Sequence, residues 1–408
     1  MSGPPPPGRP IPDVSPIDHR HARNVILGAG AMGAAAAYHL ARRGEPVLLV
    51  EQFEAGHDRG SSHGAARIIR HSYADVLYSR LMPEAFAAWR RLEAEAGELL
   101  YVKIGGLSLC PPGVDYVARV ASSLEEVGVP HRRLRGAEVR RAYPSFAVPD
   151  EFDAVFEPDA GLISASRAIA AQIELARRLG AGTTEVLERC PIRRIDLDGE
   201  RPALLADRLR ITADRLIVAA GPWAGRLLPG LADRLRPTRQ QVLYLGPDPI
   251  GPFAIGRLPA FICKGASPSE AFYGMPDFLG TGVKVARHSG PDCDPDAVDR
   301  AVDASYVDLV RDFLRGVLPS LADAPLLRSE VCLYTEAPDA HFLLGPLPGR
   351  PGVIVASPCS GHGFKFSCLI GRILADLALD DIPGIDIDLW RPGGHRGDAI
   401  GPTGGHDR

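Results

Sequence analysis

The stretch RNVILGAGAMG, residues 23–33, decides the fold of this chain. An apolar run leads into three glycines at the spacing Gly28-x-Gly30-x-x-Gly33, and an alanine-rich segment follows. A second apolar run, residues 47–50, then ends on Glu51. This order predicts a strand, a tight turn, a helix and a second strand, which is the unit that binds a dinucleotide.

Each glycine of this turn has a physical role. Gly28 allows the turn, Gly30 lets the backbone approach a pyrophosphate, and Gly33 lets the helix pack closely on the strand. The N-terminus of the helix offers N–H groups and the positive end of its dipole to phosphates. Glu51, 18 residues after Gly33, can accept a hydrogen bond from a ribose hydroxyl. The alternative, a chance Gly/Ala-rich turn, explains the strand, helix, strand and acid in register less well.

Length and composition are those of an ordinary globular protein. The 408 residues exceed what one hydrophobic core comfortably fills, so two domains are expected. The chain is 45% hydrophobic, and 46 basic against 50 acidic residues give a net charge of −4. This balance argues against nucleic acid or an anionic membrane as a partner. We find no run of about 18 apolar residues, so no membrane span is expected.

The seven cysteines are irregularly spaced and include no CxxC pair. This pattern predicts a reduced, cytoplasmic protein without a metal site. Residues 1–22 are proline-rich and then polar, without the apolar core of a secretion signal, and are predicted to form a disordered extension. Residues 391–408, rich in Gly, His and Asp, are predicted to form a flexible tail.

A loop of small residues, 60–66, leads into Arg67 and Arg70, which would share one face if the segment were helical. A solvated basic helix start is the alternative, but Ile68 and Ile69 between the arginines favour burial. Buried arginines need anionic partners, and a flavin, a phosphate or a carboxylate would serve.

Two later strands end in glycines. The buried run 216–220 ends at Gly221, as expected where a FAD-binding domain completes its parallel sheet, although any parallel strand could look alike. The strand 352–356 leads into SGHGFKF at 360–366. Gly361 and Gly363, ahead of a helix over 367–379, predict a group of backbone N–H donors for an anion or a ring carbonyl.

From Pro237 the chain changes character. Short strands with Gly and Pro, at 240–245, 260–263, 271–274 and 282–286, predict an antiparallel sheet in a second domain. A helix is expected over 297–316. Lys284 alternates with two valines and so faces away from them, and a lysine in such a position most often faces solvent.

In five blocks the chain resembles the monomeric sarcosine oxidase and N-methyl-tryptophan oxidase family, flavoproteins of the D-amino-acid-oxidase-like group. The blocks are Gly28–Gly33 with Glu51, Gly60–His71, Gly221–Trp223, Tyr273–Gly274 with Lys284 and His288, and Cys332–Thr335 with Gly361–Phe366. They occur in order between residues 23 and 390, and the last block is the most specific.

The resemblance implies an α/β fold with a FAD-binding, Rossmann-like domain and a second domain with a mixed or antiparallel sheet. The FAD-binding domain would comprise residues 23–100, 160–235 and 330–390, and the substrate-binding domain would comprise 101–159 and 236–329. The active site would lie between the flavin ring and the second sheet.

The resemblance also implies FAD joined covalently to Cys332 through an 8α-S-cysteinyl bond. By itself, Cys332 would be interpreted as an ordinary buried cysteine. The positions that would contact the cofactor are Gly28, Gly30, Ala31, Met32, Gly33, Glu51, Gln52, Ser61, Ser62, His63, Arg67, Arg70, Gly221, Cys332, Gly361, Gly363, Phe364 and Lys365.

In the family's pattern, Lys284 and Arg67 would lie beside the flavin ring, with Lys284 at the oxygen-activating position. Arg70 and Lys365 would bind a substrate carboxylate. The cavity around the substrate would be lined by Tyr273, His288 and Tyr334, with His288 and Tyr334 able to tune the loss of the amine proton.

These roles imply an enzyme that oxidises a secondary amine, such as sarcosine or N-methyl-tryptophan, with O2 to an imine and hydrogen peroxide, working as a monomer. An oxidase or desaturase of a cyclic imino acid such as pipecolate is the first alternative. A nicotinamide-dependent dehydrogenase, or a flavin-fold protein without turnover, is the second, and Cys332 and Lys284 argue against it. Ala65, Ala66 and Ser62 depart from the family's usual residues, so the amine itself is left open.

Overall fold

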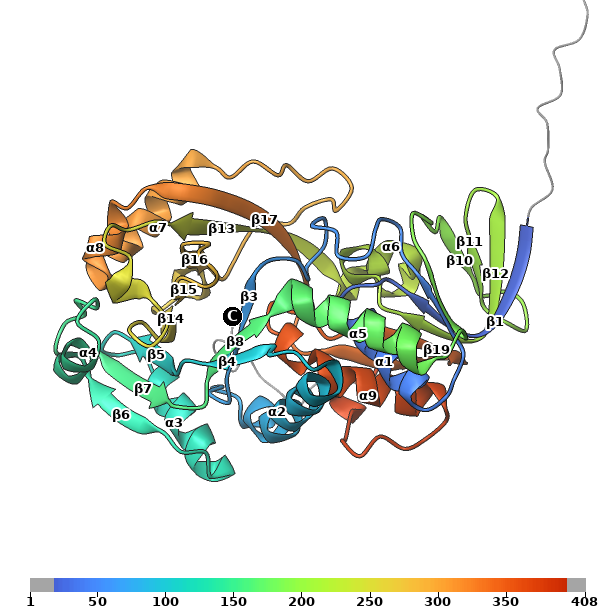
Figure 1. Ribbon diagram of the computed structural model, residues 1–408, viewed down its shortest axis with the longest axis horizontal. Helices are drawn as coiled ribbons and strands as arrows, with labels where there is room; N and C mark the ends of the chain where they lie inside the picture. Colours follow the sequence, from blue (N-terminus) through green and yellow to red (C-terminus); the bar gives the residue numbers. More distant parts are fainter. Residues whose placement is uncertain (1–17, 395–408) are drawn as a thin grey trace, which may run out of the picture.

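The structure is a computed structural model that describes residues 18–394. Figure 1 shows an elongated molecule with one large sheet towards each end and a small sheet between them. The small sheet joins β3 (Ala66–Ile69), β8 (Gly161–Ser164) and β4 (Tyr101–Lys103). The cavity described below lies where these three sheets meet.

The first large sheet is parallel at its centre. Its order is β10-β11-β12-β1-β2-β9, and β19 pairs with β12 and β18. Strands β12, β1, β2 and β9 run parallel, as do β12 and β19. The bounds are β1 (Asp18–Leu27), β2 (Val47–Val50), β9 (Thr184–Leu187), β10 (Arg194–Asp196), β11 (Ala203–Leu205), β12 (Leu209–Val218), β18 (Leu343–Leu347) and β19 (Arg350–Ser357).

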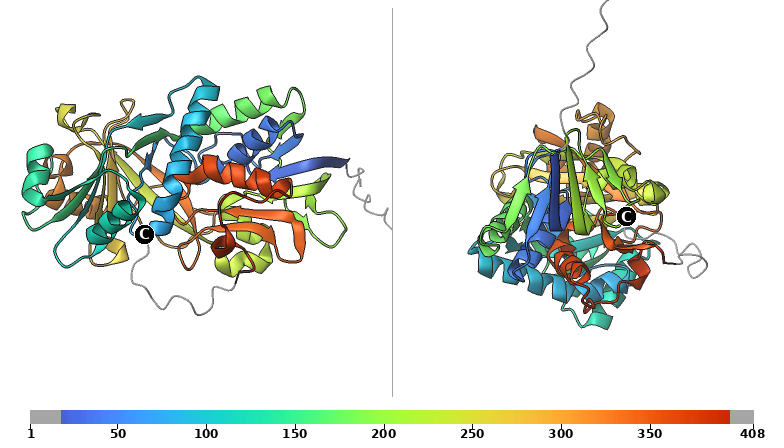
Figure 2. Two further views of the ribbon diagram at one scale, coloured as in Figure 1. Left: turned by 90° about the horizontal axis from the view of Figure 1, so that it is seen from below. Right: turned by 90° about the vertical axis from the view of Figure 1, so that its right-hand side faces the viewer.

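The central strands of this sheet are buried on both faces, as is usual for a parallel sheet. Helices cover one of these faces. All four residues of β2 are buried. Helices α1 (Ala31–Arg42), α5 (Ala165–Leu179) and α9 (Ser367–Ala378) pack side by side over it (Figures 1 and 2). A Cβ on Gly371 of α9 would lie 2.5 Å from Ala35 of α1, so small residues bring these two helices into close contact.

The second large sheet has the order β17-β13-β16-β15-β14-β5-β7-β6, and all its pairs are antiparallel except β14 with β5. The face of this sheet that points away from the cavity packs on helices α4 (Gly136–Ala142) and α7 (Ala304–Val317) through a separate hydrophobic core. Its strands are β5 (Gly106–Cys110), β6 (Arg132–Arg135), β7 (Asp153–Glu157), β13 (Arg236–Leu245), β14 (Ala260–Lys264), β15 (Ala271–Met275), β16 (Val283–Arg287) and β17 (Leu326–Glu336).

The remaining helices lie outside the two sheets. They are α2 (Val76–Ala96), α3 (Tyr116–Val127), α4 (Gly136–Ala142), α6 (Ala224–Leu227), α7 (Ala304–Val317) and α8 (Pro319–Ala322), with short 3₁₀ helices at Gly221–Trp223, Pro229–Arg234, Gly251–Phe253, Pro268–Glu270, Phe364–Phe366 and Asp388–Trp390. The predicted α/β fold, with a Rossmann-like parallel sheet and a second mixed sheet, is confirmed.

Three predicted elements differ from the structure. Strand β1 begins at Asp18, because its polar first half pairs with β12, so residues 18–22 are not part of a disordered extension. Arg67 lies on strand β3 instead of a helix, since this segment pairs with β8. Helix α7 begins at Ala304 instead of 297, because the Asp303 carboxylate before it accepts hydrogen bonds from Arg239 and Gln241.

Residues 1–17 and 395–408, predicted as extension and tail, lie outside the described residues, whereas Pro392 at the start of the tail is buried. The domain division stays a prediction. Its boundary at 330 falls inside β17, a strand of the second sheet, and its boundary at 101 falls at β4, which pairs with β8.

Candidate active site

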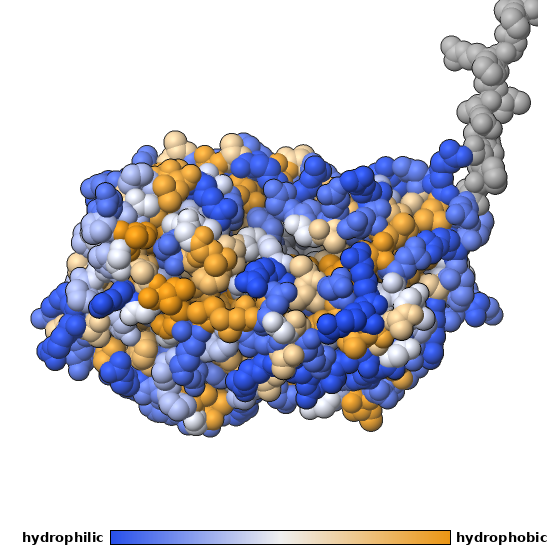
Figure 3. Space-filling view, in the orientation of Figure 1, coloured by the Kyte–Doolittle hydropathy of each residue, from blue (hydrophilic) through white to orange (hydrophobic). Residues whose placement is uncertain are grey.

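A cavity of about 450 Å³ lies between the carboxyl ends of the first sheet and one face of the second. All the predicted site residues line it except Gly33. We call the part near residues 28–32, Glu51 and Trp223 the glycine end. The part near Arg67, Lys284 and Cys332 is the charged end. Figure 3 shows hydrophobic residues at the surface near the middle of the molecule.

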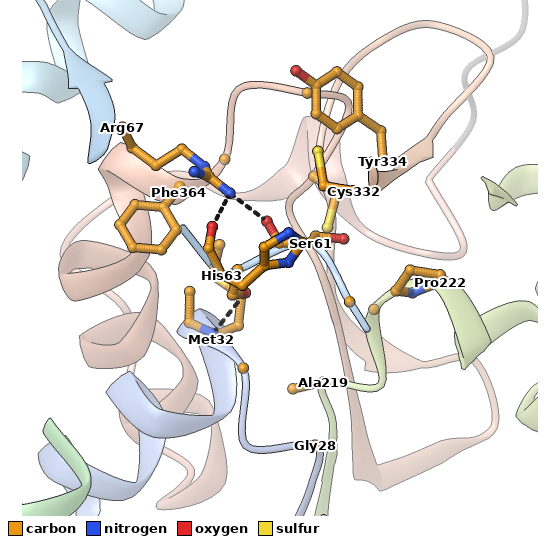
Figure 4. Close-up of a pocket in the computed structure, with 18 of the residues that line it drawn as sticks. Gly28, Met32, Ser61, His63, Arg67, Ala219, Pro222, Cys332, Tyr334 and Phe364 are labelled. Carbon is orange, nitrogen blue, oxygen red and sulfur yellow. Dashed lines mark hydrogen bonds between the residues drawn. The ribbon is translucent and has the colours of Figure 1, made fainter. Parts of the chain in front are cut away.

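The glycine end depends on close backbone contacts. Gly28 has φ +103°, and a Cβ there would lie 2.4 Å from the carbonyl oxygen of Ala219. Figure 4 shows these two residues side by side. A Cβ on Gly33 would lie 1.8 Å from the Gly28 oxygen, so Gly33 supports the turn from behind. The turn therefore directs the N-terminus of α1 into the cavity.

Glu51 closes the glycine end. Its carboxylate is buried and accepts hydrogen bonds from the backbone N–H groups of Ala29 (2.8 Å) and Phe53 (3.0 Å). Burial alone would raise the pKa of Glu51, but His57 and these N–H groups outweigh it, and the pKa lies below its usual value. An ionised carboxylate therefore stands where a ribose hydroxyl could donate to it.

Several side chains at the glycine end were not among the predicted site residues. Trp223 Nε1 donates to Asp296 Oδ1 (2.6 Å), and Asp296 also pairs with Arg226. These three side chains and Arg193 line the cavity. Asp296 lies in the segment between β16 and α7, and no local pattern indicates that this loop reaches across to the first sheet.

Arg67 sits at the centre of the charged end. Its guanidinium donates to three backbone carbonyls, those of Ser61 (3.0 Å), His63 (2.6 Å) and Ala66 (3.0 Å), as Figure 4 shows for the first two. It also lies 5.7 Å from the centre of the Phe364 ring. The carbonyls fix its orientation without neutralising its charge.

Lys284 is only 5% exposed, so the alternative of a solvent-facing lysine is wrong. It does face away from the valines, but the segment around β3 covers that face of the sheet, and its Nζ donates to the Ala66 oxygen (3.3 Å). Burial, and then the Arg67 guanidinium, lower the pKa of Lys284 to about 7. A proton on this amine is therefore weakly held.

Cys332 lies on β17 and its side chain lines the cavity. Burial raises the pKa of the thiol, and the nearby charges of Arg67 and Lys284 oppose that rise. All seven cysteines are free. Cys359, which the sequence analysis did not select, also lines the cavity.

On the face of the second sheet that borders the cavity, three polar side chains lie close together: Tyr273 of β15, Tyr334 of β17 and His288, which follows β16. His288 Nδ1 lies 3.1 Å from the Tyr334 hydroxyl, and the His288 ring lies 6.0 Å from the Tyr273 ring, edge to face. Burial raises the pKa of both tyrosines. Both phenols are therefore neutral and can serve as donors at physiological pH. Lys264 and Ile262 of β14 line the same face and were missed.

Arg70 and Lys365 are both buried and both border the cavity. The guanidinium carbon of Arg70 lies 4.3 Å from the centre of the Tyr73 ring. Lys365 Nζ donates to the Tyr73 hydroxyl (2.7 Å) and to the His362 carbonyl (2.9 Å). Two cations thus meet around one buried tyrosine.

A cofactor with a pyrophosphate and a ring system fits this cavity. The α1 N-terminus and the Gly28 turn suit phosphates, and the charged end suits a ring with electronegative edges. Within residues 18–394, the buried Ser61 Oγ and His63 Nδ1 lack a hydrogen-bond partner in the protein. Both residues line the cavity, so a bound ligand would supply the missing partners. Burial and Arg67 lower the pKa of His63 to about 4, which keeps its ring neutral.

In the described part of the chain, no cluster of His, Cys, Asp or Glu side chains could hold a metal ion. Among the helices between residues 18 and 394, none combines the length and apolar character needed to cross a membrane.

Comparisons with known proteins identify the fold and the cofactor. Residues 23–377 match the family model described as FAD dependent oxidoreductase. The chain is 34% identical to the monomeric sarcosine oxidase of Bacillus sp. (strain B-0618), over 91% of this chain and 95% of that protein. It is 32% identical to the N-methyl-L-tryptophan oxidase of Salmonella arizonae, over 90% and 97%.

Solved structures of amino acid oxidases share the fold of this chain. NikD, an unusual amino acid oxidase essential for nikkomycin biosynthesis, superposes with a TM-score of 0.79 at 25% identity, covering 91% of this chain and 98% of NikD. Glycine oxidase from Geobacillus kaustophilus shares the fold, with a TM-score of 0.77 at 20% identity, covering 91% and 98%. The match over residues 23–377, together with a cavity suited to a dinucleotide, shows that this chain belongs to the FAD-dependent oxidoreductase family.

Proposed function

We propose that this protein oxidises a secondary amine that carries a carboxylate, using FAD and O2, and releases an imine and hydrogen peroxide. The observation that carries the proposal is that buried Lys284 and Cys332 and half-buried Arg67 line one end of a cavity that is also lined by Arg70 and Lys365. A nicotinamide-dependent dehydrogenase needs neither a buried lysine nor a cysteine at this place.

FAD would be held at the glycine end by the Gly28 turn, the α1 N-terminus and Glu51. When bound, it supplies the redox chemistry, accepting a hydride equivalent from the C–H bond beside nitrogen and returning the electrons to oxygen. Ser61 and His63 would bond to it near the charged end. We propose that Cys332 forms the 8α-S-cysteinyl link, which prevents loss of the cofactor.

Lys284 would act on oxygen. Negative charge develops on O2 as it gains electrons, and an ammonium group fixed in a dry site stabilises that charge. Lys284 is buried, and the Ala66 carbonyl holds it in place. Arg67, oriented by three carbonyls, adds a second fixed positive charge beside it.

Arg70 and Lys365 would bind the substrate carboxylate, with the amine directed towards His288 and Tyr334. The hydrogen bond between these two side chains fixes their orientation at the cavity wall. Their hydrogen bonds can tune the loss of the amine proton, since the amine must be neutral before it is oxidised. The relatives named for sarcosine and N-methyl-L-tryptophan support an N-methyl amino acid as the substrate.

An anaerobic titration tests this function. Sarcosine, N-methyl-tryptophan, pipecolate and proline are added in turn to the purified protein, and the flavin absorbance is followed. We expect one of the N-methyl amino acids to bleach the flavin and, on admission of air, to yield hydrogen peroxide. Bleaching by pipecolate or proline alone would favour the cyclic imino acid alternative. A protein without flavin absorbance, or one that no amine bleaches, would contradict the proposal.

Acid precipitation tests the covalent link, since a yellow pellet retains FAD and a colourless pellet has lost it. Light scattering tests the proposed monomer. A cytoplasmic location stays a prediction.

A further inference from the structure

We propose that Tyr73 is the positioning residue of the carboxylate site, and that Glu157 holds the segment carrying Tyr73 in place. This inference rests on the proposed function, because it concerns the two cations assigned to the substrate carboxylate. Neither Tyr73 nor Glu157 lines the cavity, so both would act through Arg70 and Lys365.

Tyr73 contacts both cations. The Arg70 guanidinium lies over its ring at 4.3 Å, which is a cation–π contact, while its hydroxyl accepts the hydrogen bond from Lys365 Nζ at 2.7 Å. The ring is fully buried and packs against Tyr78 and Phe366. One rigid aromatic side chain therefore sets the spacing between a guanidinium and an ammonium from distant parts of the chain.

Glu157 fixes the backbone on which Tyr73 is placed. Its carboxylate is fully buried and accepts from the backbone N–H groups of His71 (2.9 and 3.0 Å) and Ser72 (3.0 Å). It also lies 2.6 Å from His71 Nδ1. The carboxylate therefore satisfies the backbone N–H groups of His71 and Ser72, which lie beyond Arg70 where the pairing of β3 has ended.

Glu157 comes from a different sheet than the segment whose backbone it bonds. Glu157 is the last residue of β7 and pairs with Gly106 in the second sheet, whereas Arg67 and Arg70 belong to β3 and the residue after it. The carboxylate thus links the second sheet to the segment that carries Arg70 and Tyr73. The stacking of His71 on Phe86 of α2, at 4.2 Å, holds the other side of the same segment.

The test uses two variants of the flavin-containing protein with matched controls. Tyr73→Phe removes the hydroxyl that accepts from Lys365 and keeps the ring under Arg70. Glu157→Gln replaces a carboxylate oxygen by an N–H group that would face N–H donors.

Tyr78→Phe is the control for Tyr73→Phe, since the Tyr78 hydroxyl forms a hydrogen bond with His341. Glu93→Gln is the control for Glu157→Gln, because Glu93 accepts from the N–H groups of Leu100 and Tyr101.

The first readout is binding of acetate, followed through the change it causes in the flavin spectrum. We expect the dissociation constant of acetate to rise about tenfold in Tyr73→Phe, because a charge-assisted hydrogen bond that orients Lys365 is lost. A rise of similar size is expected in Glu157→Gln, and less than about twofold in both controls. Unchanged acetate binding in both variants, or a wild-type spectrum that acetate does not alter, would overturn the inference.

The second readout compares the amine that bleaches the flavin with its decarboxylated counterpart, N-methyltryptamine for N-methyl-tryptophan or pyrrolidine for proline. The KM of the carboxylated amine should rise about tenfold with kcat nearly unchanged, while the decarboxylated amine is unaffected. Equal losses for both amines would mean a general structural role and would contradict the proposal. Failure of every amine to bleach the flavin would instead count against the proposed function, and the acetate titration would still decide the roles of Tyr73 and Glu157.

Discussion

At the glycine end of the cavity, one contiguous segment supplies backbone groups, whereas at the charged end side chains from distant segments meet. Residues 28–51 supply the backbone groups of the first end through a turn and a helix terminus, together with one carboxylate, and Trp223 and Asp296 add side chains from other segments. The second end needs Arg67 from β3, Lys284 from β16 and Cys332 from β17. The first is therefore sensitive to added atoms, and the second is sensitive to charge.

The largest effect is expected from Gly33→Ala, because a Cβ there would lie 1.8 Å from the Gly28 carbonyl oxygen. Such an overlap with backbone should destabilise the fold by about 3 kcal/mol and remove FAD binding. The ratio of flavin to protein absorbance, together with the soluble yield, measures it. Gly230→Ala is the control, since its Cβ would meet nothing within 4 Å. Equal flavin content in the two variants would contradict the role given to the close contact between Gly33 and Gly28.

Cys332→Ala should leave the glycine end intact and abolish covalent attachment. The protein should still bind FAD, but acid precipitation should release all of it, and most turnover should be lost. Cys368→Ala, a buried thiol away from the cavity lining, should keep a yellow pellet. A yellow pellet from Cys332→Ala would show that another residue carries the cofactor.

Lys284→Met should slow reoxidation of the flavin by about a hundredfold or more, because a fixed positive charge near oxygen is removed. Reduction by substrate should change far less. Stopped-flow measurement of the two half-reactions separates these outcomes. Equal losses in both would assign Lys284 to the whole site instead of to oxygen.

The reoxidation rate should also depend on pH in a defined direction. The ammonium form of Lys284 exists below its pKa, which burial lowers to about 7. The rate constant should therefore fall as pH rises through that value, towards the rate of Lys284→Met, which should itself be insensitive to pH. A wild-type rate that rises over this range would contradict the assignment.

The smallest expected effect is on stability. The pKa of Lys284 is lower in the folded protein than in the unfolded chain, so the unfolded chain binds more protons between pH 7 and its usual pKa of 10.5. The free energy of unfolding from this group should rise with pH in that window. Lys284→Met should be more stable than wild type at pH 7 by about 1 kcal/mol or more, and the gap should narrow at pH 9. Urea denaturation of both proteins at the two pH values measures it.

The same contrast explains what the sequence could predict. The glycine end could be interpreted from residues 28–51 because its geometry is local. The roles at the charged end came only through resemblance, since no spacing in the sequence brings Lys284 next to Arg67. The burial of Lys284, the strand at Arg67 and the contact between Trp223 and Asp296 all depend on segments that are far apart in the chain.

The predicted boundaries of α7 and β1 were wrong for the same reason, because contacts with distant segments fix them. The start of α7 is fixed by hydrogen bonds from β13 to Asp303, and the polar half of β1 is fixed by pairing with β12. Propensity and periodicity do not contain these contacts. Gly33, by contrast, could be interpreted as a packing residue because its role depends on a turn only five residues away, but it does not line the cavity, so its prediction as a cofactor contact differs from the structure.

Strand β17 belongs to the second sheet, while the glycine end belongs to the first. If Cys332 bonds to a cofactor whose other end lies at the Gly28 turn, that molecule becomes a crosslink between the two halves of the protein. Flavinylation would then act like a disulfide, lowering the entropy of the unfolded chain. The two halves should unfold together in the flavinylated protein, whereas a chain without the link could lose one half before the other. The cofactor would be part of the fold as well as of the chemistry.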